Sequence, residues 1–94
     1  MIRSFAEKRT KLLFETGKSR RWNSIVRAAV RKMVQIDSAV ALEDLKVPPG
    51  NQLEALKGDR AGQHSIRIND QWRICFEWPK GAAGPINVEI VDYH

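Results

Sequence analysis

The second half of the chain contains four short segments in which apolar and polar residues alternate. They are Gln52–Leu56, Gln63–Ile68, Gln71–Trp78 and Ile86–Tyr93. Alternation with a period of two is typical of strands that bury one face, and the intervening sequences KGDRAG, ND and PKGAAGP are turn-like and too short for crossover helices. We therefore predict a four-stranded antiparallel meander, and this sheet restricts what the first half of the chain can form.

The first predicted helix is bounded by local signals. Ser4 and Glu7 have the spacing of a capping box, and Gly17 is a residue type that commonly ends helices. These signals predict a helix over Phe5–Thr16. We expect its buried side to consist of Leu12, Leu13 and Phe14.

A second predicted helix, over Trp22–Ile36, has the clearest periodicity in the chain. Its apolar residues recur at steps of three and four, as on the buried side of an amphipathic helix: Trp22, Ile25, Val26, Ala29, Val30, Met33 and Ile36. The opposite side is basic and includes Arg20, Arg27 and Arg31. Taken alone, this basic stripe fits a solvated surface as well as a binding surface.

The order of these elements predicts the fold. Ser38–Gly50 breaks both periodicities and ends in VPPG, so we expect an extended linker between the helical and strand halves. The opening residues MIRSF can add an edge strand. The resulting order, β-α-α-β-β-β-β, is an α+β fold with two helices on one face of the sheet. Because neither half can bury a core alone, residues 1–94 are expected to form one domain.

Composition narrows the class of partner. Sixteen Lys and Arg against eleven Asp and Glu give a formal net charge of +5, which favours nucleic acid, with an acidic protein as the alternative.

No apolar run is long enough to cross a membrane, and the N-terminal sequence does not resemble a secretory signal, so we expect a cytoplasmic protein without a membrane partner. One cysteine and two histidines are too few for a dedicated zinc site, so neither a metal nor another cofactor is expected. Cys75 lies in an apolar strand, where a buried structural thiol is expected.

Strand parity divides the side chains of the predicted sheet between two faces. If the apolar face packs under the helices, the opposite, open face carries Arg67, Arg73, Glu77, Glu89 and Tyr93. This face fits a functional surface, or a solvated one with cross-strand ion pairs such as Arg73 with Glu89. Asp92 and His94 have core parity but are too polar to be buried unpaired, so we expect them beyond the edge of the core. A frayed terminus is the alternative.

Several segments together resemble the HigB branch of the RelE/ParE superfamily of bacterial type II toxins. They are MIRSF, LLFETGKSRRW (12–22), IDSA (36–39), LKGDRAGQHSIRINDQWRICFEW (56–78) and VEIVDYH (88–94), and they cover essentially the whole chain in order. The resemblance implies a ribosome-dependent endoribonuclease that cuts mRNA in the A site. It also implies a HigA-like helix-turn-helix antitoxin as partner, with operator DNA bound only through the complex of the two proteins.

The resemblance also implies site residues. Cleavage of RNA by its own 2′-hydroxyl requires a base, an acid and a cation for the developing charge. Arg73 is expected to stabilise that charge, and Lys57 to hold a phosphate or carry a proton. Asp92, Tyr93 and His94 match the closing motif of the family. The imidazole of His94, with an ordinary pKa of about 6.5, suits proton transfer, Asp92 can orient it or act as base, and Tyr93 can stack on a nucleobase or bind the phosphate.

The chain departs from the family at position 54. Relatives often have a histidine where this chain has Glu54, which is either a proton acceptor or a plain surface residue, so the role of His94 becomes more important. Contacts to ribosomal RNA are expected from Lys18, Arg20, Arg27 and Arg31, with Arg67 a weaker candidate.

The alternative to an endoribonuclease is a ParE-like toxin, or an RNA-binding module, that blocks its target without cleavage. The terminal DYH favours cleavage, because a blocking protein has no evident need for these groups.

Overall fold

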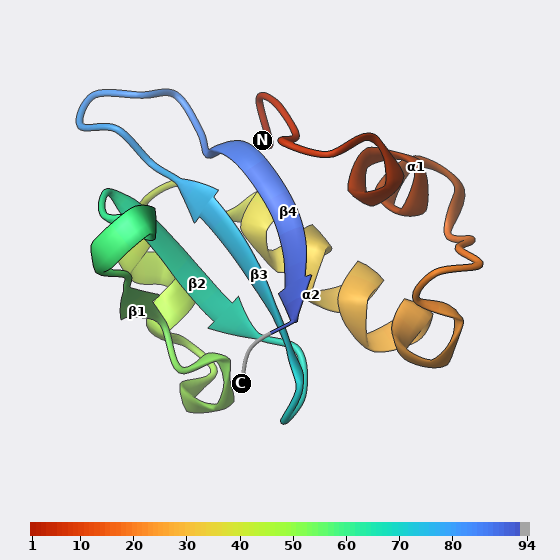
Figure 1. The fold of residues 1–94 in the computed structure, drawn as a ribbon. Helices are drawn as coiled ribbons and strands as arrows, with labels where there is room; N and C mark the ends of the chain where they lie inside the picture. The colour runs from red at the N-terminus through yellow and green to blue at the C-terminus, as the bar shows by residue number, and fades with distance from the viewer. Residues whose placement is uncertain (93–94) are drawn as a thin grey trace.

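The computed structural model describes residues 1–92, which form two α-helices and a four-stranded sheet (Figure 1). The elements are α1 (Lys8–Thr16), α2 (Val26–Ser38), β1 (Glu54–Ala55), β2 (Gln63–Arg67), β3 (Trp72–Glu77) and β4 (Ile86–Asp92). The strand order is β1-β2-β3-β4, and each neighbouring pair is antiparallel. The predicted α+β class and meander are confirmed. Within residues 1–92, no helix has the length and apolar character needed to cross a membrane.

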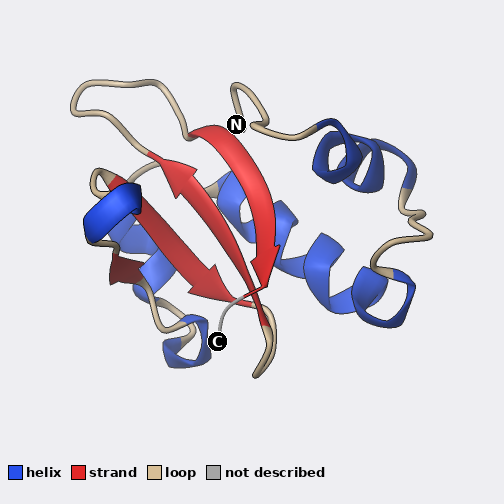
Figure 2. Cartoon of the chain, in the orientation of Figure 1, coloured by secondary structure: helices blue, strands red, loops and turns tan. Residues whose placement is uncertain are grey.

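The helices lie on one face of the sheet, with α2 behind the strands in the view of Figure 2. The periodic apolar residues of the second helical segment and the inward-facing residues of β2, β3 and β4 supply most of the core. The helical set is Trp22, Ile25, Ala29, Met33 and Ile36, and the strand set includes Ile66, Ile74, Phe76, Val88 and Ile90, all buried. Both predicted periodicities therefore identify the buried sides correctly. The first turn of the predicted second helix is a separate 3-10 turn, Asn23–Ile25.

The start of α1 differs from the prediction. The helix begins at Lys8, and its cap is Glu7, whose carboxylate accepts from the backbone N–H of Arg9 at 2.8 Å and of Thr10 at 3.1 Å. The hydroxyl of Ser4 instead accepts from the backbone N–H of Asn87 at 2.9 Å. The opening residues cannot begin a helix because their backbone is bonded to β4.

That bonding takes the form of one parallel bridge, Phe5 to Val88, rather than a full edge strand. The backbone N–H of Ala6 donates to the Val88 carbonyl at 3.0 Å, and the Val88 N–H donates to the Ser4 carbonyl at 3.1 Å. The predicted edge strand is thus reduced to a single pairing at the outer side of β4.

The buried side of α1 also differs from the prediction. Leu13 is buried as expected, but Leu12 is 54% exposed and Phe14 is half-buried. Thr10 is buried in their place, and its hydroxyl accepts from the backbone N–H of Ile90 at 3.2 Å. A helix nine residues long cannot turn three consecutive side chains toward one surface, because each residue rotates the direction by about 100°.

The segment between α2 and β1 is more ordered than an extended linker. It forms two 3-10 turns, Leu42–Lys46 and Pro49–Asn51. Leu45 joins the core, and the buried amide of Asn51 donates to the Leu45 carbonyl at 3.1 Å and to Oε1 of Gln35 on α2 at 3.0 Å. The linker therefore packs against α2. Short 3-10 turns have too few residues to produce a periodic signal in the sequence.

The first strand is shorter than predicted. Gln52 adopts a left-handed backbone with φ 47° at the end of the second 3-10 turn, so it cannot extend the strand. β1 is limited to Glu54–Ala55, paired with Ser65 and His64 of β2. This short strand leaves the outer edge of the open face to the residues of the following turn.

Candidate active site

A row of polar side chains crosses the open face of the sheet. In the strand register, Glu54 is opposite Ser65, Ser65 is opposite Cys75, and Cys75 is opposite Glu89. Directly paired residues in neighbouring strands point to the same face. The row therefore lies on the face that α2 does not cover, as strand parity predicted for Glu89.

The turn after β1 folds over this face. Gly58 has φ 65°, a left-handed conformation that side-chain-bearing residues rarely adopt, and it opens the short 3-10 turn η4 (Gly58–Arg60). Lys57 precedes the turn and Arg60 ends it. Glu89 is on β4, and its Oε2 lies 3.3 Å from Nη1 of Arg60. The sequence had suggested Arg73 as a possible ion-pair partner of Glu89, and in the structure Arg60 is the partner.

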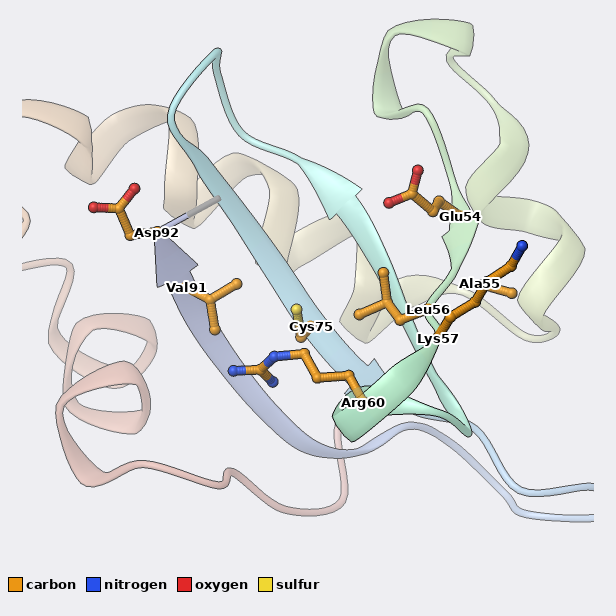
Figure 3. Close-up of a pocket in the computed structure, with 8 residues that line it drawn as sticks. All are labelled: Glu54, Ala55, Leu56, Lys57, Arg60, Cys75, Val91 and Asp92. Atoms are coloured by element: carbon orange, nitrogen blue, oxygen red, sulfur yellow. The ribbon is translucent and has the colours of Figure 1, made fainter. Parts of the chain in front are cut away.

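A cavity of 460 Å³ lies between this turn and the sheet (Figure 3). Three of the predicted catalytic residues, Glu54, Lys57 and Asp92, line it. Its other lining residues are Ala55, Leu56, Arg60, Cys75 and Val91. The structure thus brings together residues that are up to 38 positions apart in the sequence, 54 to 92.

Asp92 lies at the far end of β4 (Figure 3). It is opposite Trp72 in the register, so it has the parity of the core, and yet it is exposed because the strand has passed the edge of the core. Its Oδ2 accepts from Nε2 of Gln71 at 3.2 Å. This position matches the one expected from parity and polarity. Tyr93 and His94, which follow it in the predicted site, lie outside the described residues.

Arg73 lies on the same face but lines a neighbouring hollow. This second hollow, of 380 Å³, is lined by Gln52, Arg67, Asn69, Asp70 and Arg73. Arg73 and Cys75 are alternate residues of β3, so they are neighbours on the open face. Arg67 forms an ion pair with Asp70. The four predicted catalytic residues that the structure describes are therefore distributed over two adjoining hollows rather than one.

The Arg73 guanidinium is buried and is held by hydrogen bonds to Ser65 and Gln52. Only 6% of the residue is exposed. Its Nε donates to Oγ of Ser65 at 2.7 Å, and its Nη2 donates to the carbonyls of Gln52 at 2.6 Å and Ser65 at 3.3 Å. Strand parity predicted correctly that the Arg73 side chain points to the open face, but it did not predict that the side chain is buried. The burial arises because Gln52, at the end of the linker, covers this arginine.

Cys75 forms the floor of the first cavity and is fully buried. Burial raises the pKa of its thiol to about 11, against partly cancelling effects of charges around it: Arg60 and Arg73 lower this pKa, and Glu89 and Glu54 raise it. A thiol with this pKa is protonated at neutral pH. The expected structural role of Cys75 therefore agrees with its surroundings.

We expect Cys75 in the folded protein to react very slowly with iodoacetamide at pH 7. With a pKa of about 11, roughly one thiol in ten thousand is ionised at pH 7, against about 3% for an ordinary thiol. The thiolate forms as pH rises, so the labelling rate measured by mass spectrometry should increase about tenfold per pH unit from pH 7 to pH 10. Labelling in urea is the control and should be fast. Equally fast labelling of the folded protein at pH 7 would contradict this assignment.

The residues expected to bind RNA do not line the cavity, and all of them except the half-buried Arg67 are exposed. Lys18 and Arg20 line a groove of 810 Å³ beside α1, together with Arg9, Leu12, Thr16, Ser19 and Arg21. Arg27 and Arg31 are exposed on α2. Figure 1 shows α1 beyond the β4 edge of the sheet, whereas β1 and the turn over the cavity are at the opposite edge. Of the five candidates, Arg67 alone lies on the open face.

Arg60 is a charged residue of the cavity that sequence reasoning missed. It lies in KGDRAG, which has no periodicity, and its direction depends on the left-handed backbone of Gly58 and on Glu89, 29 residues away. A spacing of three from Lys57 across a predicted turn was the one available signal, and it does not indicate which face the side chain points to.

Comparison with known proteins identifies the family. Residues 3–94 match the family model described as RelE-like toxin of type II toxin-antitoxin system HigB. The chain is similar to Toxin HigB-1 of Vibrio cholerae serotype O1, with 40% identity over 85 residues that cover 88% of this chain and 90% of that protein. It is also similar to Endoribonuclease HigB of Proteus vulgaris, with 38% identity over 95 residues and 100% of both chains covered.

Among solved structures, the fold is similar to that of the YoeB/ParE toxin from Agrobacterium tumefaciens. The TM-score is 0.53 at 21% identity, with 98% of each chain covered. This likeness supports the arrangement of two helices on an antiparallel sheet. From the family model and the two relatives, the chain belongs to the HigB family of RelE-like toxins of type II toxin–antitoxin systems.

Proposed function

We propose that this toxin is a ribosome-dependent endoribonuclease that cuts mRNA in the A site by using the ribose 2′-hydroxyl as nucleophile. The observation that carries the proposal is the cavity on the open face, which Glu54, Lys57 and Asp92 line and which adjoins the hollow of the buried Arg73. The relative from Proteus vulgaris that is named Endoribonuclease HigB supports the same class of activity.

The reaction divides into three tasks. The 2′-oxygen forms a bond to the adjacent phosphorus and loses its proton to a base, while the bond from phosphorus to the 5′-oxygen breaks and that oxygen takes a proton from an acid. The products are a 2′,3′-cyclic phosphate and a 5′-hydroxyl. This route uses no metal ion, so we propose that the protein supplies the base, the acid and the charge stabilisation.

We assign these tasks to groups on the open face. A carboxylate can accept the 2′ proton, and Glu54 and Asp92 both line the cavity. His94 is the proposed acid, since its imidazole can be cationic near neutral pH, and Tyr93 is proposed to contact the phosphate or a nucleobase. Arg73 is proposed to stabilise the charge on the phosphorane. Its guanidinium is already held by Ser65 and Gln52, and a preorganised donor stabilises charge without a reorganisation cost.

Lys57 is proposed to bind a phosphate as a point charge at the β1 edge of the cavity. Contacts with ribosomal RNA are proposed for Lys18, Arg20, Arg27 and Arg31, which lie on the helical side, and for Arg67 on the open face. In this arrangement the ribosome holds the message against the open face, and much of the catalytic effect comes from that positioning.

A toxin of a type II system has a cognate antitoxin. We propose that the partner here is a HigA-like helix-turn-helix protein, that both proteins are cytoplasmic, and that this toxin reaches operator DNA only within their complex. The net charge of +5 suits the RNA substrate, and an acidic surface on the antitoxin would bind the same basic protein at a different time.

Mapping the 5′ ends of transcripts after induction of the toxin without its antitoxin tests the proposal. We expect new 5′ ends inside translated codons, and none in the same transcripts when their start codons are removed. The control is a catalytically impaired Arg73→Ala toxin at equal abundance. Growth arrest with unchanged 5′ ends would instead identify a toxin that blocks its target in the manner of ParE.

A further inference from the structure

The side chain of Arg60 lines the cavity between the turn and the sheet. In Figure 3 it extends from the turn toward Cys75 and Val91, whereas Lys57 points away from them. Glu54 and Lys57 therefore lie toward β1, Asp92 lies at the end of β4, and a guanidinium lies between them. A cation in this position is close to any strand of nucleotides that crosses the open face.

The Arg60 guanidinium is oriented by two acceptors. Nη1 donates to Oε1 of Gln63 at 3.0 Å and to Oε2 of Glu89 at 3.3 Å. Within residues 1–92 these bonds use Nη1 alone, and 40% of the side chain is exposed. A guanidinium has five N–H donors in a planar fork, so Nε and Nη2 retain three donors for a ligand.

The ion pair with Glu89 gives orientation more than stability. Both side chains are partly exposed, 40% for Arg60 and 26% for Glu89, and exposed ion pairs of this kind contribute little to folding. An arginine that is held in one direction but contributes little to the fold is suited to binding. The planar fork of an arginine matches two oxygens of a phosphate group.

We propose that Arg60 binds a phosphate of the RNA strand next to the one that is cut, and that Glu89 and Gln63 direct it toward that phosphate. The proposal rests on the proposed function and adds a substrate-binding residue to it. Arg73, in the adjoining hollow, is assigned to the cut phosphate, and Arg60 lies farther along the same face, over Cys75. Two arginines along one face fit consecutive phosphates of a single strand.

The test measures binding separately from cleavage. Purified toxin is bound to ribosomes that carry a message with 2′-deoxyribose throughout the A-site codon, so the substrate stays intact, and to ribosomes with no message in the A site. For the wild-type toxin we expect tighter binding when the message is present. Arg60→Gln should weaken the message-dependent binding about tenfold, the effect of a charge-assisted hydrogen bond, and leave binding to empty ribosomes unchanged.

Three further variants separate orientation from charge. Arg60→Lys keeps the charge without the fork, and Glu89→Gln keeps Arg60 but weakens the contact that orients it, so both should give intermediate losses. Arg3→Gln removes an exposed arginine outside the cavity and should bind as the wild type does. Thermal unfolding should change little for any of them.

The outcomes distinguish this inference from the proposed function. If the wild-type toxin does not bind ribosomes at all, the proposed function is wrong and Arg60 has no message to hold. If the wild type shows message-dependent binding and Arg60→Gln shows the same affinity, the proposed function stands and the role of Arg60 is rejected. Loss of neutralisation by the antitoxin with unchanged message binding would also reject it, by assigning Arg60 to the protein partner.

Discussion

Replacing Arg73 with alanine is expected to abolish growth arrest and to lower the rate of message cleavage by about 100- to 1000-fold. The magnitude is that of removing one preorganised donor from a site where negative charge develops. Arg73 is the residue of the open face that best fits this description, since it is 6% exposed and bonded to Ser65 and Gln52. The measurement is single-turnover cleavage of a ribosome-bound message.

The same substitution should also destabilise the fold. Without the guanidinium, the carbonyls of Gln52 and Ser65 lose a donor, and an unsatisfied buried group costs about 1–3 kcal/mol. Urea unfolding must therefore accompany the kinetic measurement. Arg73→Lys is the matched control, because it restores the charge but not the Nε contact with Ser65, and it should recover part of the activity. A folded Arg73→Ala toxin that cleaves at the wild-type rate would contradict the assignment.

Replacing His94 with alanine is expected to lower cleavage by about 100- to 10,000-fold, the usual contribution of a positioned proton donor or acceptor. Folding is expected to be unaffected, because residues 1–92 supply the buried core and the strand register that the structure describes. This result would separate the role of His94 from that of Arg73, whose loss affects both stability and rate.

The pH dependence of the cleavage rate shows whether His94 acts as a general acid. A general acid is active in its protonated form, so the wild-type rate should fall as pH rises through the imidazole pKa, ordinarily about 6.5. In His94→Gln this decrease should disappear, leaving a low and flat alkaline side of the profile. If His94→Gln retains the wild-type rate and profile, another group supplies the proton.

The sheet was predictable because the alternation of apolar and polar residues that indicates a strand is local and periodic. Alternating residues in the last three strands determine which side chains face the helices, and this placed Ile74 and Phe76 in the core and Arg73 on the open face. The second helix was predictable for the same reason, from apolar residues at steps of three and four.

The predictions from sequence were wrong where a contact with a residue far away in the chain overrides a local signal. Ser4 and Glu7 have the spacing of a capping box, but β4 bonds the opening residues and moves the cap to Glu7 itself. Burial of Arg73 depends on Gln52, which lies 21 residues away, and the direction of Arg60 depends on Glu89. Such contacts have no counterpart in composition or periodicity. They decide which residues share the cavity.

Cleavage of a message that carries a single 2′-deoxyribose tests the central claim most directly. The substitution is placed at the nucleotide 5′ to the mapped cut, the message is bound to ribosomes with the cut codon in the A site, and an all-ribose message is the control. We predict that the toxin cuts the control to leave a 2′,3′-cyclic phosphate, and that the single deoxyribose abolishes cleavage at that position. Cutting of the substituted message at the same position and rate would show that the 2′-hydroxyl is not the nucleophile and would contradict this account.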